Sequence, residues 1–205
     1  MPPGVPPSGA NRRQMIRRTV LGFAFALTFF GTASAASLPH VAIVTSAGTI
    51  VVELDSKRAP ITTKNFLHLV DSRAYDGATF YRTVSKAAVP GSNIEVIQGG
   101  LQGVNRIPDQ KIALEQTSTT HLHNTSGAIS MARTSDPNSG SSEFFLCVGD
   151  NTFLDAENQP DHLGYAAFGH VVRGYDVVLK INHAAATSQM LTAPVTIRRM
   201  RRVPT

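Results

Sequence analysis

Few side chains of this chain have the types and spacing that covalent or metal-dependent chemistry requires. His121 and His123 are two residues apart, so on a strand they would share one face and could bind a metal ion. No third ligand is evident nearby, and two solvated loop histidines are the simpler interpretation. The sequence contains no glycine-rich phosphate loop, no CxxC pair and no HExxH motif. We therefore expect neither a metal ion nor a cofactor.

The evidence for a catalytic nucleophile is equally weak. Cys147 is the only cysteine, which excludes an intramolecular disulfide, and it stands between Leu146 and Val148. A cysteine in such surroundings is expected to be a small buried hydrophobic residue rather than a nucleophile. Residues 139–142 form a Gly/Ser-rich turn without the GxSxG elbow, so a hydrolase has little support.

The elements that would position a site are short β-segments separated by turn signals. With 42% hydrophobic and 16% charged residues, the chain has the composition of a globular protein. Apolar residues alternate onto one face in the second segment. We expect strands at 40–45, 49–55, 78–84, 94–98, 128–133, 143–148, 165–172 and 195–202. Eight segments, with a helix after the second and another after the seventh, predict an all-β fold: a closed eight-stranded antiparallel β-barrel capped by two α-helices.

The two expected helices and two long loops complete the pattern. Pro60 suits the start of the first helix, and Thr62 or Thr63 could cap it. The second helix is expected at 176–183. The loops at 85–95 and 103–124 are long for a compact domain, so each is either functional or a tolerated surface insertion.

Residues 1–36 have the ordered features of a cleavable signal peptide. An arginine pair precedes the apolar run 20–31, which is too short to span a bilayer comfortably. The small residues that follow predict cleavage after Ala35 or Ala36. A general secretory signal fits better than a twin-arginine signal, and a buried N-terminal helix is the weaker alternative. The start is proline-rich, so Met15 could be the true first residue.

The positive charge of the chain is concentrated outside the expected mature domain, residues 37–205. The formal net charge is +5, but four of the 19 basic residues and none of the acidic ones precede the cleavage site. The other 15 basic residues nearly balance the 14 acidic ones, so we expect no nucleic-acid partner. A basic cluster remains near the C-terminus, where a solvated strand and tail are expected rather than a polyanion site: Arg198, Arg199, Arg201 and Arg202.

A series of motifs, in order and at compatible spacing, resembles the cyclophilins over most of residues 40–203. The first are Ala59-Pro60, Asn65-Phe66, YDGATFYR at 75–82, QGG at 98–100 and GAISMA at 127–132. They continue with Pro137-Asn138 leading to SEFF at 142–145, FLD at 153–155, FGHV at 168–171 and GYDVV at 174–178. One such motif would be weak evidence, but this ordered series is specific.

This resemblance implies prolyl isomerisation in a groove on the outside of the barrel. An X–Pro bond prefers trans only slightly, yet rotation about it faces a barrier of about 18–20 kcal/mol. An enzyme can lower that barrier by favouring a twisted amide, with a donor for the pyramidal prolyl nitrogen and an apolar pocket for the ring.

The matched positions imply Arg82 as the catalytic residue. A guanidinium suits this role because it is always charged and holds its donors in one plane. An exposed strand charge is the alternative. Phe145 matches the floor of the proline pocket, and Gln98 matches the residue that orients the arginine. Without the resemblance, Phe145 and Val96 would be interpreted as core residues. The substrate-binding positions implied are Val96, Gln98, Ala132, Arg133, Glu143, Phe145, Phe153, Leu154 and Tyr165.

Several departures from the family pattern fall in this site. Glu143 stands where glutamine is usual, adding a carboxylate that could pair with Arg82 or Arg133. Arg133 replaces an asparagine that meets the substrate backbone in the family, so the resemblance implies only a main-chain contact at this position. Phe153 replaces the tryptophan that helps many members bind cyclosporin, so weak cyclosporin binding is expected. Tyr165 replaces a groove histidine and keeps an aromatic ring with a polar tip.

The insertion at 85–94 displaces the pocket phenylalanine of the family, and the role of that phenylalanine is assigned to no residue.

The resemblance implies a peptidyl-prolyl cis/trans isomerase, or rotamase, that assists folding of exported bacterial proteins in the periplasm. Its partners would be Pro-containing polypeptides, and we expect a monomer with no stable membrane span after signal cleavage. The main alternative is a noncatalytic Pro-peptide-binding or chaperone module. A ligand-carrying barrel would need an empty interior, which the many large apolar residues argue against.

Overall fold

The computed structural model describes residues 37–86, 89–102 and 110–204. The expected signal peptide and its cleavage site lie outside these residues, as do parts of the two long loops. Within the described ranges, no helix combines the length and apolar character needed to cross a membrane.

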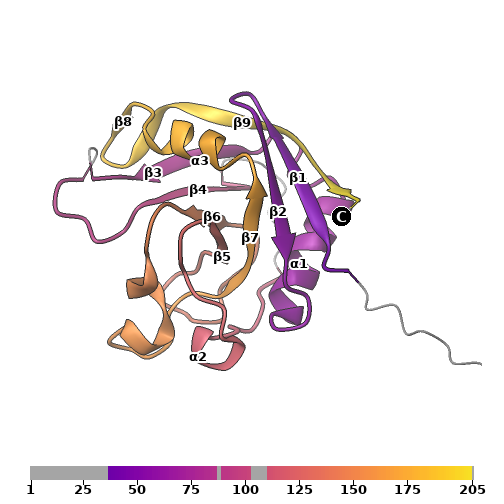
Figure 1. Cartoon of the computed structure of the whole chain (residues 1–205), viewed down its shortest axis with the longest axis vertical. Helices are drawn as coiled ribbons and strands as arrows, with labels where there is room; N and C mark the ends of the chain where they lie inside the picture. Colours follow the sequence, from indigo (N-terminus) through magenta and orange to yellow (C-terminus); the bar gives the residue numbers. More distant parts are fainter. Residues whose placement is uncertain (1–36, 87–88, 103–109, 205) are drawn as a thin grey trace, which may run out of the picture. The chain divides into compact units, whose positions relative to one another are not determined.

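Eight strands form a closed antiparallel ring, as expected from the sequence. Each strand of the ring pairs with the next in the order β1-β2-β7-β5-β6-β4-β3-β9, and β9 pairs back with β1 (Figure 1). The two-residue β8 pairs only with β9. The strands are β1 (His40–Thr45), β2 (Thr49–Leu54), β3 (Thr79–Val84), β4 (Val96–Gly100), β5 (Ala128–Met131), β6 (Phe144–Cys147), β7 (Ala167–Arg173), β8 (Ala186–Thr187) and β9 (Met190–Val203).

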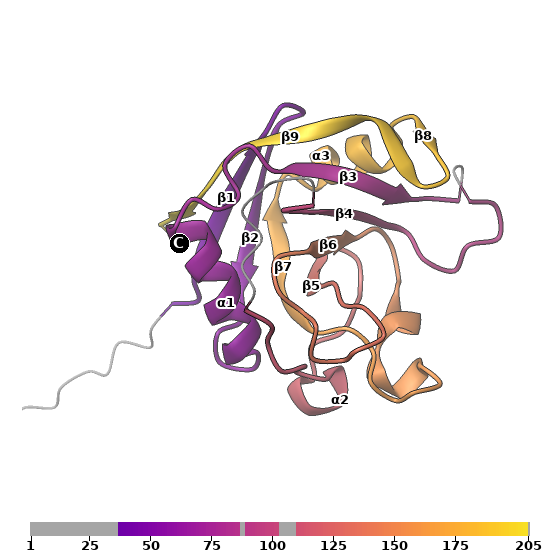
Figure 2. The ribbon, with the colours of Figure 1, turned by 180° about the vertical axis from the view of Figure 1, so that it is seen from behind.

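Two helices follow β2 and β7, as the sequence predicts. They are α1 (Pro60–Asp71) and α3 (Tyr175–Asn182), and they lie apart on different sides of the strands (Figure 2). Both contribute side chains to the one large core cluster, so each covers part of the barrel interior. A short helix, α2 (Thr117–Thr120), and two 3-10 turns, Thr152–Leu154 and Ala156–Asn158, were not expected.

The barrel interior is filled with aromatic side chains. Phe144 packs edge-on against Phe66, Tyr75 and Phe80, with ring centroids 5.4–5.6 Å apart. Phe168 packs against Phe66 at 5.3 Å, and all five rings are fully buried. An interior packed in this way leaves no room for a carried ligand, which rules out the carrier hypothesis.

The N-terminus of α1 is capped differently from the sequence expectation. Thr62 and Thr63 already lie within the helix, because Pro60 occupies its first turn, and their buried hydroxyls have no hydrogen-bond partner among the described residues. Glu115, from a distant loop, accepts hydrogen bonds from the backbone N–H groups of Ile61 and Thr62 at 3.0 and 2.7 Å. A carboxylate at this position satisfies free N–H groups and complements the helix dipole.

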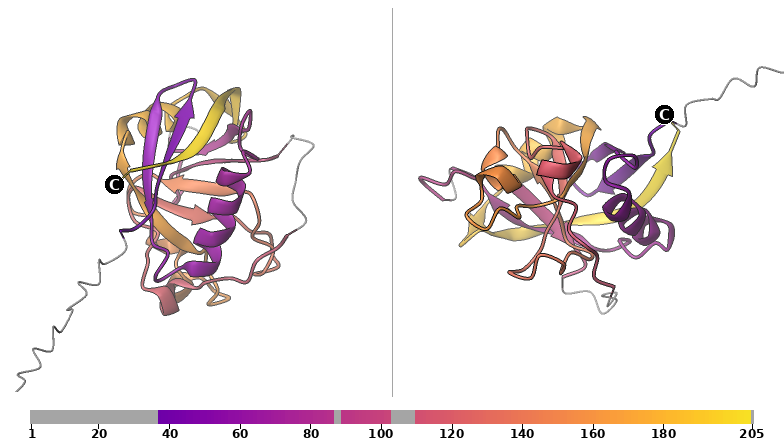
Figure 3. Two further views of the ribbon diagram at one scale, coloured as in Figure 1. Left: turned by 90° about the vertical axis from the view of Figure 1, so that its right-hand side faces the viewer. Right: turned by 90° about the horizontal axis from the view of Figure 1, so that it is seen from below.

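The last strand is longer than the sequence pattern indicates. β9 begins at Met190, five residues before the expected start, and its two halves pair with β3 and with β1 (Figure 3). A tight turn at Ser188 and Gln189, with φ of 48° and 72°, joins β8 to β9. This turn brings residues 189 and 190 beside β3. The four C-terminal arginines are exposed along β9, as expected for a solvated strand.

Candidate active site

Three of the expected site residues lie in one row across neighbouring strands. Arg82 of β3 is directly opposite Gln98 of β4, and Gln98 is opposite Phe145 of β6. Cross-strand partners project their side chains from the same face of a sheet. That face is the outside of the barrel, because the alternate residues Ile97 and Phe144 belong to the interior core.

A second apolar cluster surrounds Phe145 on the outside of the barrel. Phe145 is only 5% exposed and meets the Tyr165 ring edge-on, with centroids 5.7 Å apart. The cluster brings together most of the expected apolar pocket residues and has two groups of members. Its buried members are Val84, Val96, Ala128, Phe145, Cys147 and Leu154, and the half-buried side chains packed on it are Val89, Ile94, Ala132 and Tyr165.

The segment between β3 and β4 contributes to this cluster. Val89 and Ile94 come from the insertion that displaces the family's pocket phenylalanine, and both pack against the cluster. Apolar side chains of the insertion therefore extend this cluster. Cys147 is fully buried within it, and burial raises the pKa of its thiol, which agrees with an inert hydrophobic role.

The guanidinium of Arg82 is held from two sides. Its Nη1 donates to Gln98 Oε1 at 2.7 Å, as the sequence-based role for Gln98 requires. Its Nε and Nη2 both donate to Gln189 Oε1, at 2.9 and 2.5 Å. Gln189 was not predicted, because it lies 107 positions along the chain from Arg82 and its place depends on the turn before β9. In this position the guanidinium is half-buried and held two strands away from Phe145.

The carboxylate of Glu143 pairs with neither Arg82 nor Arg133, in contrast to the sequence-based hypothesis. It accepts a hydrogen bond from the Tyr81 hydroxyl at 2.6 Å and another from the backbone N–H of Gln102 at 3.0 Å. Burial raises the pKa of Glu143, although these hydrogen bonds oppose the shift. Burial and the neighbouring carboxylate both raise the pKa of Tyr81, which keeps the phenol protonated.

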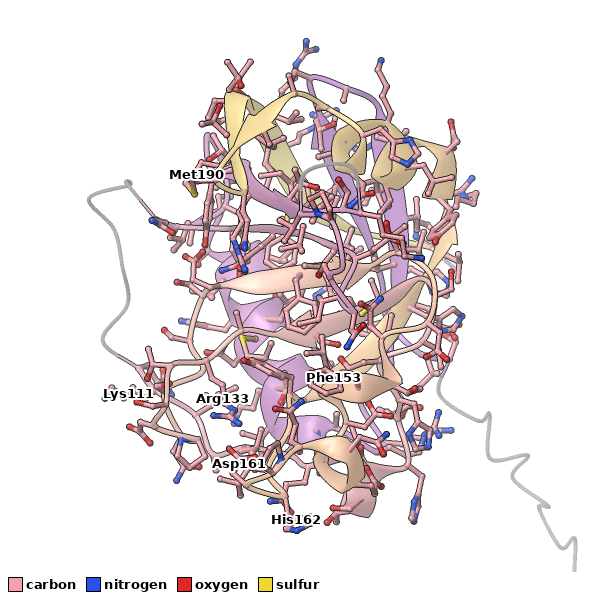
Figure 4. The ribbon with its side chains drawn as sticks, turned by 90° about the vertical axis from the view of Figure 1, so that its left-hand side faces the viewer. Lys111, Arg133, Phe153, Asp161, His162 and Met190 are labelled. Atoms are coloured by element: carbon pink, nitrogen blue, oxygen red, sulfur yellow. The ribbon has the colours of Figure 1, made fainter. Side chains whose placement is uncertain are left out.

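The side chain of Arg133 is engaged within the protein. It donates to the carbonyl of Gly164 at 2.7 Å and pairs with Asp161 at 3.2 Å, and its charge lies 5.0 Å from the centre of the Tyr165 ring. Arg133 and Asp161 lie close together in Figure 4. Only the main chain at this position therefore has the freedom to meet a substrate.

Two large apolar side chains remain exposed on the same side of the domain as Arg133 (Figure 4). Phe153 is 46% exposed and precedes the buried Leu154, and Met190 is 45% exposed and lies opposite Arg82 in the β3–β9 pairing. Of the expected apolar site residues, Phe153 is therefore the one that lies outside the apolar cluster.

The two histidines lie in a loop rather than on one strand face. His121 ends α2 with a positive φ of 54°, and His123 Nδ1 lies 2.8 Å from Asp155 Oδ2. Glu157 is close enough for the three side chains His123, Asp155 and Glu157 to offer ligand atoms within 4.8 Å of one another. The expectation that no third potential ligand is near was therefore wrong, because the fold brings these carboxylates from about 30 positions further along the chain.

The chain resembles known proteins of one family in both sequence and fold. The family described as cyclophilin type peptidyl-prolyl cis-trans isomerase matches residues 40–202. Peptidyl-prolyl cis-trans isomerase A of Dickeya dadantii is 42% identical over 160 residues, which cover 76% of this chain and 78% of that protein. A peptidyl-prolyl cis-trans isomerase of Streptomyces antibioticus, named cyp18, is 38% identical over 139 residues, covering 67% of this chain and 80% of the relative.

Solved structures with the same fold include two cyclophilins. One, a cyclophilin type peptidyl-prolyl cis-trans isomerase of Cryptosporidium parvum, has a TM-score of 0.68 at 21% identity and covers 82% of this chain and 99% of its own. The other, cyclophilin AquaCyp293 from Hirschia baltica, has a TM-score of 0.62 at 21% identity, with coverage of 79% and 73%. The closed barrel and the sequence matches agree, and the chain belongs to the cyclophilin-type peptidyl-prolyl cis-trans isomerase family.

Proposed function

We propose that this protein catalyses cis/trans isomerisation of X–Pro bonds in polypeptides, with Arg82 as the catalytic residue. The observation that carries the proposal is the row of Arg82, Gln98 and Phe145 on the outside of the barrel. It places a fixed cation two strands from an aromatic ring, a separation of about 10 Å between backbones. A proline ring against Phe145 therefore brings its peptide bond within reach of the guanidinium.

The geometry of Arg82 suits the electronic demand of the reaction. Three of its five N–H groups are bound to Gln98 and Gln189, and no described residue occupies the other two. Rotation removes the amide resonance, so the prolyl nitrogen becomes pyramidal and gains a basic lone pair. A donor fixed beside that lone pair stabilises the twisted amide more than either planar form, which lowers the barrier without covalent chemistry.

The apolar cluster supplies the binding part of the mechanism. Phe145 packs with Val96 and Leu154 in this cluster, and Tyr165 stands edge-on to its ring. Aromatic and aliphatic walls of this kind bind a pyrrolidine ring by excluding water. Because the ring is held, the residues before proline can turn relative to it. The backbone at Ala132 and the adjoining main chain at Arg133 would meet the substrate on the other side of the groove.

Cyclosporin should bind weakly. The Phe153 side chain is exposed and adjoins the buried Leu154 in the sequence, and it offers apolar area but no indole N–H donor. A nanomolar affinity for cyclosporin, measured by calorimetric titration, would contradict this expectation.

We assign the enzyme to the periplasm of a bacterium, where as a monomer it would assist folding of exported proteins. The support is the arginine pair, apolar run and small residues within 1–36, together with relatives of bacterial origin. N-terminal sequencing of the secreted protein should begin at Ala36 or Ser37, and retention of the apolar run would contradict export by this route.

The proposed activity is tested with a protease-coupled assay on a short Pro-containing peptide. We expect the protein to accelerate cis-to-trans conversion in proportion to its concentration. Exchange NMR on the same peptide distinguishes catalysis from mere binding, because a noncatalytic binding module shifts peptide resonances without adding cis/trans exchange. Absence of acceleration in both measurements would contradict an isomerase.

A further inference from the structure

We propose that Glu143 is a positioning residue of this isomerase: its ionised carboxylate, acting through Tyr81 and Gln98, holds Arg82 in its working orientation. The proposal rests on the proposed function of Arg82. Glu143 itself would touch neither the prolyl nitrogen nor the proline ring.

An unbroken chain of hydrogen bonds joins the two charged groups. The Tyr81 hydroxyl donates to Glu143 Oε2 at 2.6 Å. Gln98 Nε2 donates to the same hydroxyl at 2.7 Å, and Gln98 Oε1 accepts from Arg82 Nη1 at 2.7 Å. Tyr81 is buried and the other three are partly buried, so water competes poorly for these bonds.

The two ends of the chain fix its direction. A guanidinium can only donate hydrogen bonds, and an ionised carboxylate can only accept them. Gln98 must therefore offer its oxygen to Arg82 and its NH2 group to Tyr81. Tyr81 must then accept from Gln98 and give its proton to Glu143. One arrangement satisfies all four groups.

A neutral group at position 143 would allow a second arrangement. It could donate to the Tyr81 oxygen, and Tyr81 would then donate to the oxygen of a flipped Gln98. The NH2 group of Gln98 would face Arg82, which would lose one of its two acceptors. Ionised Glu143 excludes this flipped state, because a carboxylate has no proton to donate.

The surroundings hold Glu143 in place without neutralising it. Its other oxygen accepts from the Gln102 N–H at 3.0 Å, and a Cβ atom at Gly100 would lie 2.5 Å from the carboxylate. No described residue forms an ion pair with it. The titratable groups that interact with it within the described ranges are Tyr75 and Tyr81, and Arg133 lines the same pocket.

A double-mutant cycle in the full-length protein tests the proposal. The single variants are Glu143→Gln, which keeps the size of the side chain, and Tyr81→Phe, which removes the relay. We expect each to lower kcat/KM by about three- to tenfold. In the double variant the second change should add no further loss, because position 143 then has no route to Arg82. Thermal unfolding confirms that each variant is folded.

Glu157→Gln is the matched control. Glu157 also accepts a hydrogen bond from a side-chain hydroxyl, that of Thr117 at 2.9 Å, and its variant should retain the wild-type kcat/KM. NMR of the Arg82 guanidinium gives a readout independent of activity: hindered rotation in the wild type and faster rotation in Glu143→Gln.

The outcomes distinguish a failure of the positioning role of Glu143 from a failure of the proposed isomerase activity. Additive losses in the cycle, or unchanged rotation of Arg82 in Glu143→Gln, overturn the positioning role while leaving the isomerase intact. An inactive wild type, by contrast, contradicts the proposed function itself, whatever the NMR result for Arg82.

Discussion

Gln189 and Arg82 meet across the β3–β9 boundary, and a single oxygen of Gln189 accepts hydrogen bonds from both Nε and Nη2 of the guanidinium. Gln189 adopts a positive φ of 72°, which is costly for a residue with a side chain, and its carbonyl accepts from the Thr83 N–H at 2.8 Å. The strained turn thus serves to place an acceptor that Gln98 alone cannot supply.

Replacing Gln189 should therefore impair catalysis according to the reach of the new side chain. Gln189→Asn tolerates the positive φ but is too short to reach the guanidinium, so we expect kcat/KM to fall by about tenfold. Gln189→Glu keeps an acceptor at the same length and should retain most of the activity. Protease-coupled assays on both variants check this, and equal activity of the two would show that the contact does not matter.

Arg82→Ala should lower kcat/KM by about 10²- to 10³-fold, the usual cost of removing a preorganised donor, while the fold survives. Arg82→Lys should recover only part of this loss, because an ammonium cannot make three planar bonds. Arg199→Ala, which removes an exposed arginine of β9, is the control and should change nothing. Full activity in Arg82→Ala would remove the basis of the proposed mechanism.

The pH dependence of kcat/KM should report the ionisation of Glu143. Burial raises the pKa of this carboxyl above its usual 4.5, so protonation sets in as the pH falls through that raised value. The flipped arrangement of Gln98 then becomes accessible and activity should decline. In Glu143→Gln this acid limb should disappear, since the amide does not titrate. A limb that persists unchanged in the variant would assign the titration to another group.

The same shift predicts a gain in stability from Glu143→Gln. A carboxyl with a raised folded-state pKa contributes stability that is fully present below the unfolded pKa and is lost as the pH rises through the folded pKa. The glutamine side chain does not ionise, so the variant loses no stability as the pH rises from the unfolded-state to the folded-state pKa. Its Tm should therefore exceed that of the wild type at neutral pH, and the difference should vanish towards about pH 4. Calorimetry across this range provides the measurement, and a lower Tm at neutral pH would contradict the prediction.

Phe144 and Phe145 are adjacent in sequence but face opposite sides of β6, so truncating them should have different effects. Phe144→Ala opens a cavity among Phe66, Tyr75 and Phe80 and should cost about 3–5 kcal/mol of unfolding free energy. Phe145→Ala should reduce kcat/KM by about tenfold or more in a protein that still folds. Denaturant titrations beside activity assays compare the two, and an identical pattern for both would refute the assignment of faces.

Local patterns in the sequence were enough to predict the strands and the two helices, whereas the expected site residues came from the resemblance to a known family. Residues two apart share a strand face, which is why Val96 and Gln98, and likewise Glu143 and Phe145, could be expected on one face before the fold was known. Contacts that depend on closure of the ring were beyond reach. The Glu115 cap of α1, the Tyr81–Glu143 hydrogen bond and the Gln189–Arg82 contact join residues 53 to 107 positions apart.

Because β1 pairs with β9, the ring of strands can close only after its last strand has been synthesised. β1 cannot complete its pairing until β9 has been synthesised, and the turn that contains Gln189 directly precedes β9. Contacts so distant along the chain are slow to form, so a nascent polypeptide should remain unfolded until β9 is available to pair. Folding and competence for turnover would then begin together.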